Sequence, residues 1–172
     1  MREGNILQII MRSKLLAVVF SFLIYAFALA DDAVNVDLYA AKETAKKANK
    51  LVMLVLTRPA TCSLCVSFKK NVLENSSFRS FAKKNLILVV IEYTRDNKYA
   101  VAEHADEQKK ASKEFRAKYP EYKLLPGVFL IDPKTDADTF VQSPEVASMK
   151  AADFNRKVKA FQRELNKKAV AK

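Results

Sequence analysis

The sequence predicts an α/β fold with a central four-stranded mixed sheet and helices on both faces. Two unbroken apolar runs, residues 51–56 and 86–91, are typical of strands that are buried on both faces. An amphipathic helical stretch separates the two runs, so they form a strand–helix–strand unit with parallel strands. Residues 128–131 and 139–142 are joined by a short turn and form an antiparallel hairpin. The expected strand order in the sheet is 2-1-3-4.

Residues 1–30 have the pattern of a secretory signal peptide. Basic residues precede an apolar run over residues 15–30, which ends in an Ala-Leu-Ala sequence. This run rises roughly 24 Å as a helix and is shorter than the ~30 Å hydrocarbon core, which favours a cleaved signal over a membrane anchor. We therefore predict an exported protein, periplasmic or secreted, with one mature domain over residues 31–172 and no stable membrane anchor.

The chain is strongly basic, with a formal net charge of +11 among its 172 residues. Positive charge of this size favours acidic partners or anionic surfaces. The lysines are spread along the helical stretches instead of forming one cluster, so we interpret them as solvated faces and predict no nucleic-acid partner. Half of the residues are hydrophobic, which is enough for the core of one domain.

Helical spacing of apolar residues predicts the remaining elements. The expected helices cover residues 37–49, 62–73, a short stretch around Phe78 and Phe81, 108–118, and 149–167. Ser76 or Ser77 is expected to cap the short helix. Residues 93–107 are polar and weakly patterned, and we expect a loop there.

The only two cysteines, Cys62 and Cys65, lie between the first strand and the helix that follows it. Cys62 is thereby placed at a helix N-terminus, where unpaired backbone N–H groups stabilise an anion such as a thiolate. Cys65 lies one turn later and can reach back to Cys62. Arg58, four residues before Cys62, can add a stabilising positive charge. This arrangement predicts a reversible dithiol–disulfide pair.

Other uses of the two cysteines remain open. A disulfide across so short a loop removes little chain entropy, which disfavours a purely structural bond. A zinc site needs further ligands, and the only histidine is His104 in the predicted loop. We therefore predict no metal and no other cofactor, and we interpret His104 as a solvated side chain rather than a general base.

From about Val36 to Leu165 the chain resembles the thioredoxin superfamily. The resemblance rests on the Cys-Ser-Leu-Cys motif after a buried strand, on Pro126 just before the third strand, and on the order of elements. In that family a proline at this place has a cis peptide bond and lies against the active-site disulfide. The resemblance implies that Leu125, Pro126 and Gly127 bind the substrate segment as an added strand.

The chain departs from the family pattern at several positions. Thr61 precedes the first cysteine, where the family usually has Trp, and Leu56 stands where thioredoxins keep a buried Asp. Gly127 replaces the Thr that is common after the proline. Glu92, near the end of the second strand, is a candidate proton relay in place of the missing acid, although an exposed strand-end carboxylate is the favoured interpretation. The departures imply a weaker reductant than thioredoxin.

The resemblance implies a thiol:disulfide oxidoreductase in which Cys62 and Cys65 are the catalytic residues. Arg58, Thr61 and Glu92 are candidates for tuning this pair. The implied partners are a protein thiol or disulfide, or a small thiol, together with a redox partner protein. Two alternatives remain open. The domain is a binding or chaperone-like module with dispensable cysteines, or it is a redox-sensing accessory protein without turnover.

Overall fold

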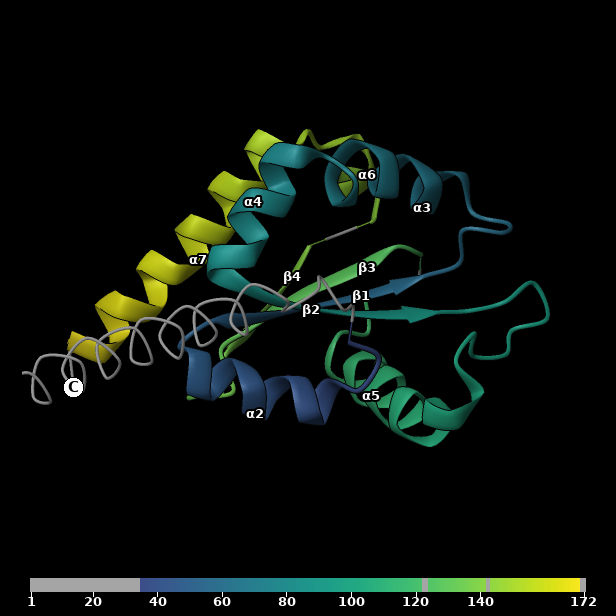
Figure 1. The fold of residues 1–172 in the computed structure, drawn as a ribbon, viewed down its shortest axis with the longest axis horizontal. Coiled ribbons are helices and arrows are strands. Elements are labelled where there is room, and N and C mark those ends of the chain that lie inside the picture. The colour runs from purple at the N-terminus through teal and green to yellow at the C-terminus, as the bar shows by residue number, and fades with distance from the viewer. Residues whose placement is uncertain (1–34, 122–123, 142, 171–172) are drawn as a thin grey trace, which may run out of the picture. The chain divides into compact units, whose positions relative to one another are not determined.

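The computed structural model describes residues 35–121, 124–141 and 143–170. At its centre is a four-stranded sheet with the strand order β2-β1-β3-β4 (Figure 1). The strands are β1 (Leu51–Thr57), β2 (Leu86–Glu92), β3 (Gly127–Ile131) and β4 (Asp138–Val141). β1 and β2 run parallel, whereas β3 pairs antiparallel with both β1 and β4. The predicted fold class, mixed sheet and strand order are confirmed.

Helices cover both faces of this sheet. In the described residues they are α2 (Leu38–Ala48), α3 (Ser63–Phe68), the π-helical η1 (Lys69–Leu73), α4 (Ser76–Asn85), the 3-10 helix η2 (Ala102–His104), α5 (Ala105–Lys118), α6 (Ser143–Ser148) and α7 (Ala151–Val170). Figure 1 shows α3, α4, α6 and α7 on one face and α2 and α5 on the other. The helix after the first cysteine ends at Leu73 as predicted, but its second half is π-helical.

The central strand β1 is buried along its whole length. Its side chains alternate between two apolar clusters, because successive residues of a strand point to opposite faces. Met53 and Val55 pack on the face of α3, α4, α6 and α7, whereas Leu54 and Leu56 pack on the face of α2 and α5. This double burial fixes the carboxyl end of β1, and with it the start of the segment that carries the cysteines.

The cap of α4 differs from the prediction. We expected Ser76 or Ser77, but the N-cap is Asn75. Its side-chain oxygen accepts hydrogen bonds from the backbone N–H groups of Ser77 at 3.0 Å and Phe78 at 3.4 Å. Asn caps a helix about as well as Ser, and Asn75 is the first residue of the three that leaves the preceding helix.

Two further predictions need correction. Residues 93–107 are not loop throughout, because η2 and the first turn of α5 lie within them. The acidic Asp106 and Glu107 in that first turn are a helix-start signal, since negative charge is favoured near a helix N-terminus. In addition, α6 was not predicted, and the last helix begins at Ala151 instead of Met149.

The predicted signal peptide over residues 1–30 lies outside the described residues, as do Gln142 and Tyr122. Within the part of the chain that the structure describes, no helix is both long enough and apolar enough to cross a membrane.

Candidate active site

Cys62 is the N-cap residue of α3 and follows the turn that leaves β1. The turn is closed by a backbone hydrogen bond from Thr61 N–H to the Arg58 carbonyl at 3.3 Å. The Cys62 sulfur accepts the backbone N–H of Cys65 at 3.1 Å, as a capping oxygen would. The predicted placement of Cys62 at a helix N-terminus is therefore confirmed, and the sulfur is in direct contact with one of the N–H donors there.

Cys62 and Cys65 are joined by a disulfide, and their Cα atoms are 5.2 Å apart. The two sulfurs differ in their surroundings. Cys62 is half-buried, whereas Cys65, in the first turn of α3, is only 1% exposed. An incoming sulfur can therefore reach Cys62 but not Cys65, which is the asymmetry required of a nucleophilic and a resolving cysteine.

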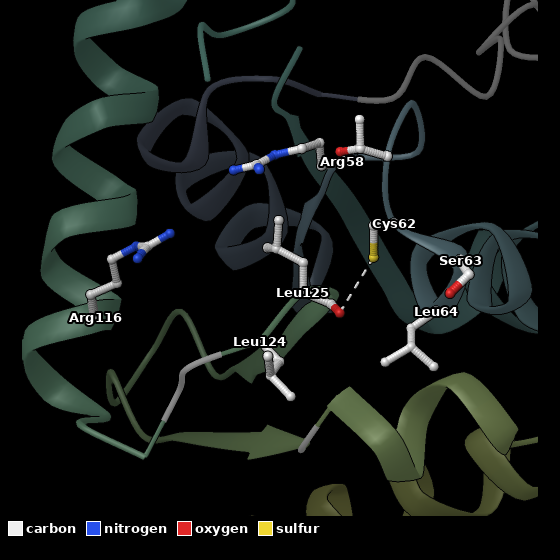
Figure 2. Close-up of a pocket in the computed structure, with 8 residues that line it drawn as sticks. Arg58, Cys62, Ser63, Leu64, Arg116, Leu124 and Leu125 are labelled. Carbon is white, nitrogen blue, oxygen red and sulfur yellow. Dashed lines mark hydrogen bonds between the residues drawn. The ribbon is translucent and has the colours of Figure 1, made fainter. Parts of the chain in front are cut away.

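The segment before β3 lies directly against Cys62. The Leu125–Pro126 peptide bond is cis, as predicted. The Leu125 carbonyl oxygen is 3.5 Å from the Cys62 sulfur, along the dashed line of Figure 2. A protonated Cys62 thiol can donate to this carbonyl, whereas the Cys65 N–H favours the thiolate. The two contacts therefore act on the protonation of Cys62 in opposite directions.

An open pocket of about 460 Å³ lies beside Cys62. Its lining residues are Arg58, Thr61, Cys62, Ser63, Leu64, Arg116, Leu124 and Leu125 (Figure 2). Leu64 and Leu124 are 36% and 57% exposed and lie together beside this pocket. The pocket is thus lined by an accessible sulfur, exposed apolar surface and the side chains of two arginines.

A family model described as thioredoxin-like matches residues 32–133. The chain belongs to the thioredoxin-like family. Two solved structures share its fold. "DsbH Oxidoreductase" is 22% identical, with a TM-score of 0.57, 76% of this chain covered and 87% of that chain covered. A disulphide isomerase from Xylella fastidiosa Temecula1 is 15% identical, with a TM-score of 0.51 and coverages of 73% and 88%. No curated protein matches the chain.

The thioredoxin-like fold brings some of the predicted site residues together and leaves others apart. Arg58, Thr61 and Leu125 line the pocket with Cys62. Pro126 and Gly127 are buried behind Leu125 and do not line it. The fold thus gathers three of the predicted residues around the accessible sulfur.

The candidate proton relay lies apart from the pocket. Glu92 is exposed at the end of β2, where it pairs with Thr57, and it does not line the pocket. Leu56 is fully buried in the apolar cluster of α2 and α5. No proton acceptor therefore takes the place of the thioredoxin aspartate at this position.

Arg58 lies over the ring of Tyr93. The Tyr93 hydroxyl belongs to a small polar cluster with Ser112 and Tyr99 between β2 and α5. The Arg58 guanidinium carbon is 5.9 Å from the centre of the Tyr93 ring, and the Tyr93 hydroxyl hydrogen-bonds the Ser112 side-chain oxygen at 2.7 Å. Burial raises the pKa of Tyr99, whose ring centre is 5.2 Å from that of Tyr93. The Tyr99 hydroxyl therefore stays neutral at physiological pH and supplies no negative charge to this region.

Tyr119 packs against aromatic side chains of the sheet and does not line the pocket. Its ring centre lies 5.4 Å from that of Phe129 and 5.5 Å from that of Phe140. His104 ends η2 and does not line the pocket. Among the described residues, no group of three or more His, Cys, Asp or Glu side chains is placed to hold a metal ion.

Sequence reasoning did not assign four residues of the pocket to the site: Ser63 and Leu64 between the cysteines, and Arg116 and Leu124. Leu124 carries a weak signal, because it is a leucine in a turn next to the proline-led strand. Arg116 carries none that we can identify. It follows the inward-facing Phe115 on α5, and only the packing of that helix on the sheet brings it near Cys62.

The burial difference between the sulfurs predicts selective alkylation. When the reduced protein is treated with limiting iodoacetamide, Cys62 should react at least about tenfold faster than Cys65. Fragmentation of the peptide that carries both cysteines separates the two sites by mass. Protein unfolded in guanidinium is the control, and there the two rates should converge. Equal rates in the folded protein would contradict the assignment of Cys62 as the accessible sulfur.

Proposed function

We propose that the protein is an exported thiol:disulfide oxidoreductase and that Cys62 and Cys65 are its catalytic pair. One observation carries the proposal. A half-buried Cys62 sulfur at the mouth of an open pocket accepts the N–H of Cys65 in the first turn of α3, and it is bonded to the fully buried Cys65 sulfur. A thioredoxin-like fold with such a pair at disulfide distance supports thiol–disulfide exchange. The two structural neighbours, named as an oxidoreductase and a disulphide isomerase, are in line with it.

The reaction takes place in two exchange steps. When the protein is reduced, the Cys62 thiolate attacks a substrate disulfide. A bond forms between Cys62 and one substrate sulfur while the substrate S–S bond breaks, and the other sulfur leaves and takes up a proton. Cys65 then loses its proton and attacks Cys62, forming the protein disulfide and releasing the second substrate thiol. The protein loses two electrons and the substrate gains two. The reverse direction oxidises a substrate dithiol.

The substrate segment is proposed to lie along Leu125, with Pro126 and Gly127 supporting that backbone from behind. Leu125 supports this role because it lines the pocket and its carbonyl lies 3.5 Å from the reactive sulfur. An extended segment at this position adds a strand beside Cys62 and places a disulfide within reach. Arg58 and Thr61 border the same space and are the tuning residues of the proposal, whereas the position of Glu92 gives a relay role no support.

Two other functions compete with this proposal. Leu64 and Leu124 are exposed beside the pocket, which also suits a binding or chaperone-like module that holds apolar segments without redox turnover. A redox-sensing accessory protein would form and break the same disulfide without passing electrons to a substrate. The three functions predict different effects of replacing Cys62 on disulfide reduction and on partner binding.

Cys62→Ala should abolish catalysis and leave the fold intact. Insulin reduction with dithiothreitol as electron donor should fall to the uncatalysed rate, because Cys65 is buried and cannot take over the attack. Ser80→Ala, at an exposed position of α4, is the matched control and should keep full activity.

Circular dichroism should show that both variants are folded. A wild-type protein that never exceeds the uncatalysed rate would contradict the oxidoreductase proposal. If Cys62→Ala also retained a bound partner, the binding module would be favoured instead.

Export and the mature domain over residues 31–172 are proposed from the N-terminal sequence pattern. When the full chain is expressed in a bacterial host, the protein in the exported fraction should begin at Asp31. Intact-mass analysis of that fraction measures the cleavage site, and a variant with Ala28 and Ala30 changed to Lys should remain uncleaved. Exported protein that still carries the segment before Asp31 would contradict cleavage.

A further inference from the structure

The pocket beside Cys62 has a strong charge asymmetry. Among the described residues that line it, Arg58 and Arg116 are positively charged and none is acidic. Arg58 comes from the turn after β1 and Arg116 from α5, so two distant segments bring two positive charges to one space. Figure 2 shows both guanidinium groups directed into the pocket on one side of Leu125, with Cys62 on the other side.

Arg58 retains hydrogen-bonding capacity that the described residues do not use. Its Nε atom is buried and has no hydrogen-bond partner among them. A buried donor without a partner costs free energy, so the Arg58 side chain is not fully satisfied in this structure. The aromatic ring of Tyr93 is 5.9 Å from the guanidinium carbon and supplies no acceptor oxygen in that direction. Tyr99, whose phenol interacts electrostatically with Arg116, remains neutral because burial raises its pKa.

Guanidinium groups are matched to a particular ligand chemistry. Their planar forks pair with carboxylates through two parallel N–H···O bonds, which adds geometric selection to charge attraction. On the other side of the pocket, Leu64 and Leu124 offer exposed apolar surface near the sulfur. A ligand that fills this pocket therefore presents its disulfide to Cys62 and a negative group to the two arginines.

We propose that this protein selects disulfides that carry a carboxylate next to the attacked sulfur, and that Arg58 and Arg116 bind this carboxylate. The inference rests on the proposed function, since it names the substrate class of the same site. The carboxylate comes either from an acidic residue beside a half-cystine in a polypeptide or from a small carboxylate-bearing disulfide. Both sources present the same chemistry to the arginines.

The first experiment compares three peptide disulfides that differ at one position. Aspartate, asparagine or lysine precedes the cysteine of otherwise identical blocked peptides. Each is mixed with pre-reduced full-length protein in a single turnover, quenched with acid and separated by chromatography. Each rate is divided by the rate of the same peptide with dithiothreitol, which removes differences in intrinsic reactivity. The aspartate peptide should react about tenfold faster than the asparagine peptide at low ionic strength, and the lysine peptide slowest.

Variants assign this preference to the pocket. The aspartate-to-asparagine rate ratio should fall toward one in Arg58→Gln combined with Arg116→Gln, and each single variant should lie between. Arg163→Gln on the exposed surface of α7 removes the same charge away from the pocket and should keep the wild-type ratio. A ratio that survives in the double variant, or that falls equally in Arg163→Gln, would overturn the inference.

A second arm identifies the source of the carboxylate. Glutathione disulfide is compared with its fully esterified form under the same conditions. A larger acid-to-ester ratio than the aspartate-to-asparagine ratio supports a small disulfide as substrate, and a smaller one supports an acidic polypeptide segment.

The outcomes also separate this inference from the function on which it rests. If all substrates react well but without preference, the inference is wrong and the oxidoreductase proposal stands. If none reacts beyond the uncatalysed rate, the oxidoreductase proposal fails as well.

Discussion

The antiparallel pairing of β1 with β3 determines where the reactive sulfur lies. In this register Leu56 is opposite Gly127, so the carboxyl end of β1 lies beside the start of β3 at the same end of the sheet. The chain continues from β1 through a short turn to Cys62, and it enters β3 through Leu125. The result is the 3.5 Å approach of the Leu125 carbonyl to the Cys62 sulfur. A slip of one residue would turn every buried side chain of β3 to the other face, so the burial of both strands holds the site in place.

The chemistry of the pair follows from a few groups around it. The Cys65 N–H stabilises a Cys62 thiolate, the Leu125 carbonyl favours a protonated thiol, and the buried Leu56 offers no base that could deprotonate Cys65. A stabilised thiolate stabilises the reduced form of the pair, and this makes its disulfide a better oxidant. The missing base slows resolution when the protein acts as a reductant. The Cys65 N–H and the missing base both point away from a strong thioredoxin-like reductase, whereas the Leu125 carbonyl opposes the first of these two effects.

The sequence was sufficient for most of the fold because burial leaves a direct pattern in the chain. The apolar runs of β1 and β2, the spacing between them and the two cysteines predicted the sheet and the reactive pair. The cis Leu125–Pro126 bond came from family resemblance and is confirmed. Asn75, Ser76 and Ser77 are all residue types that cap helices well, and the sequence alone could not decide which of them caps α4, so Asn75 was missed. Arg116 was beyond sequence reasoning, because its place in the pocket depends on how α5 is rotated against the sheet.

The reduction potential of the Cys62–Cys65 pair tests the central claim of a redox-active disulfide most directly. Titration with glutathione buffers, followed by thiol alkylation and mass measurement, gives this potential for the folded protein. We predict a reversible two-electron transition at a potential above the roughly −270 mV of thioredoxin. A potential at or below that value would contradict the effects of the Cys65 N–H and of Leu56 on the pair. A pair that stays oxidised below about −300 mV would be a structural bond instead.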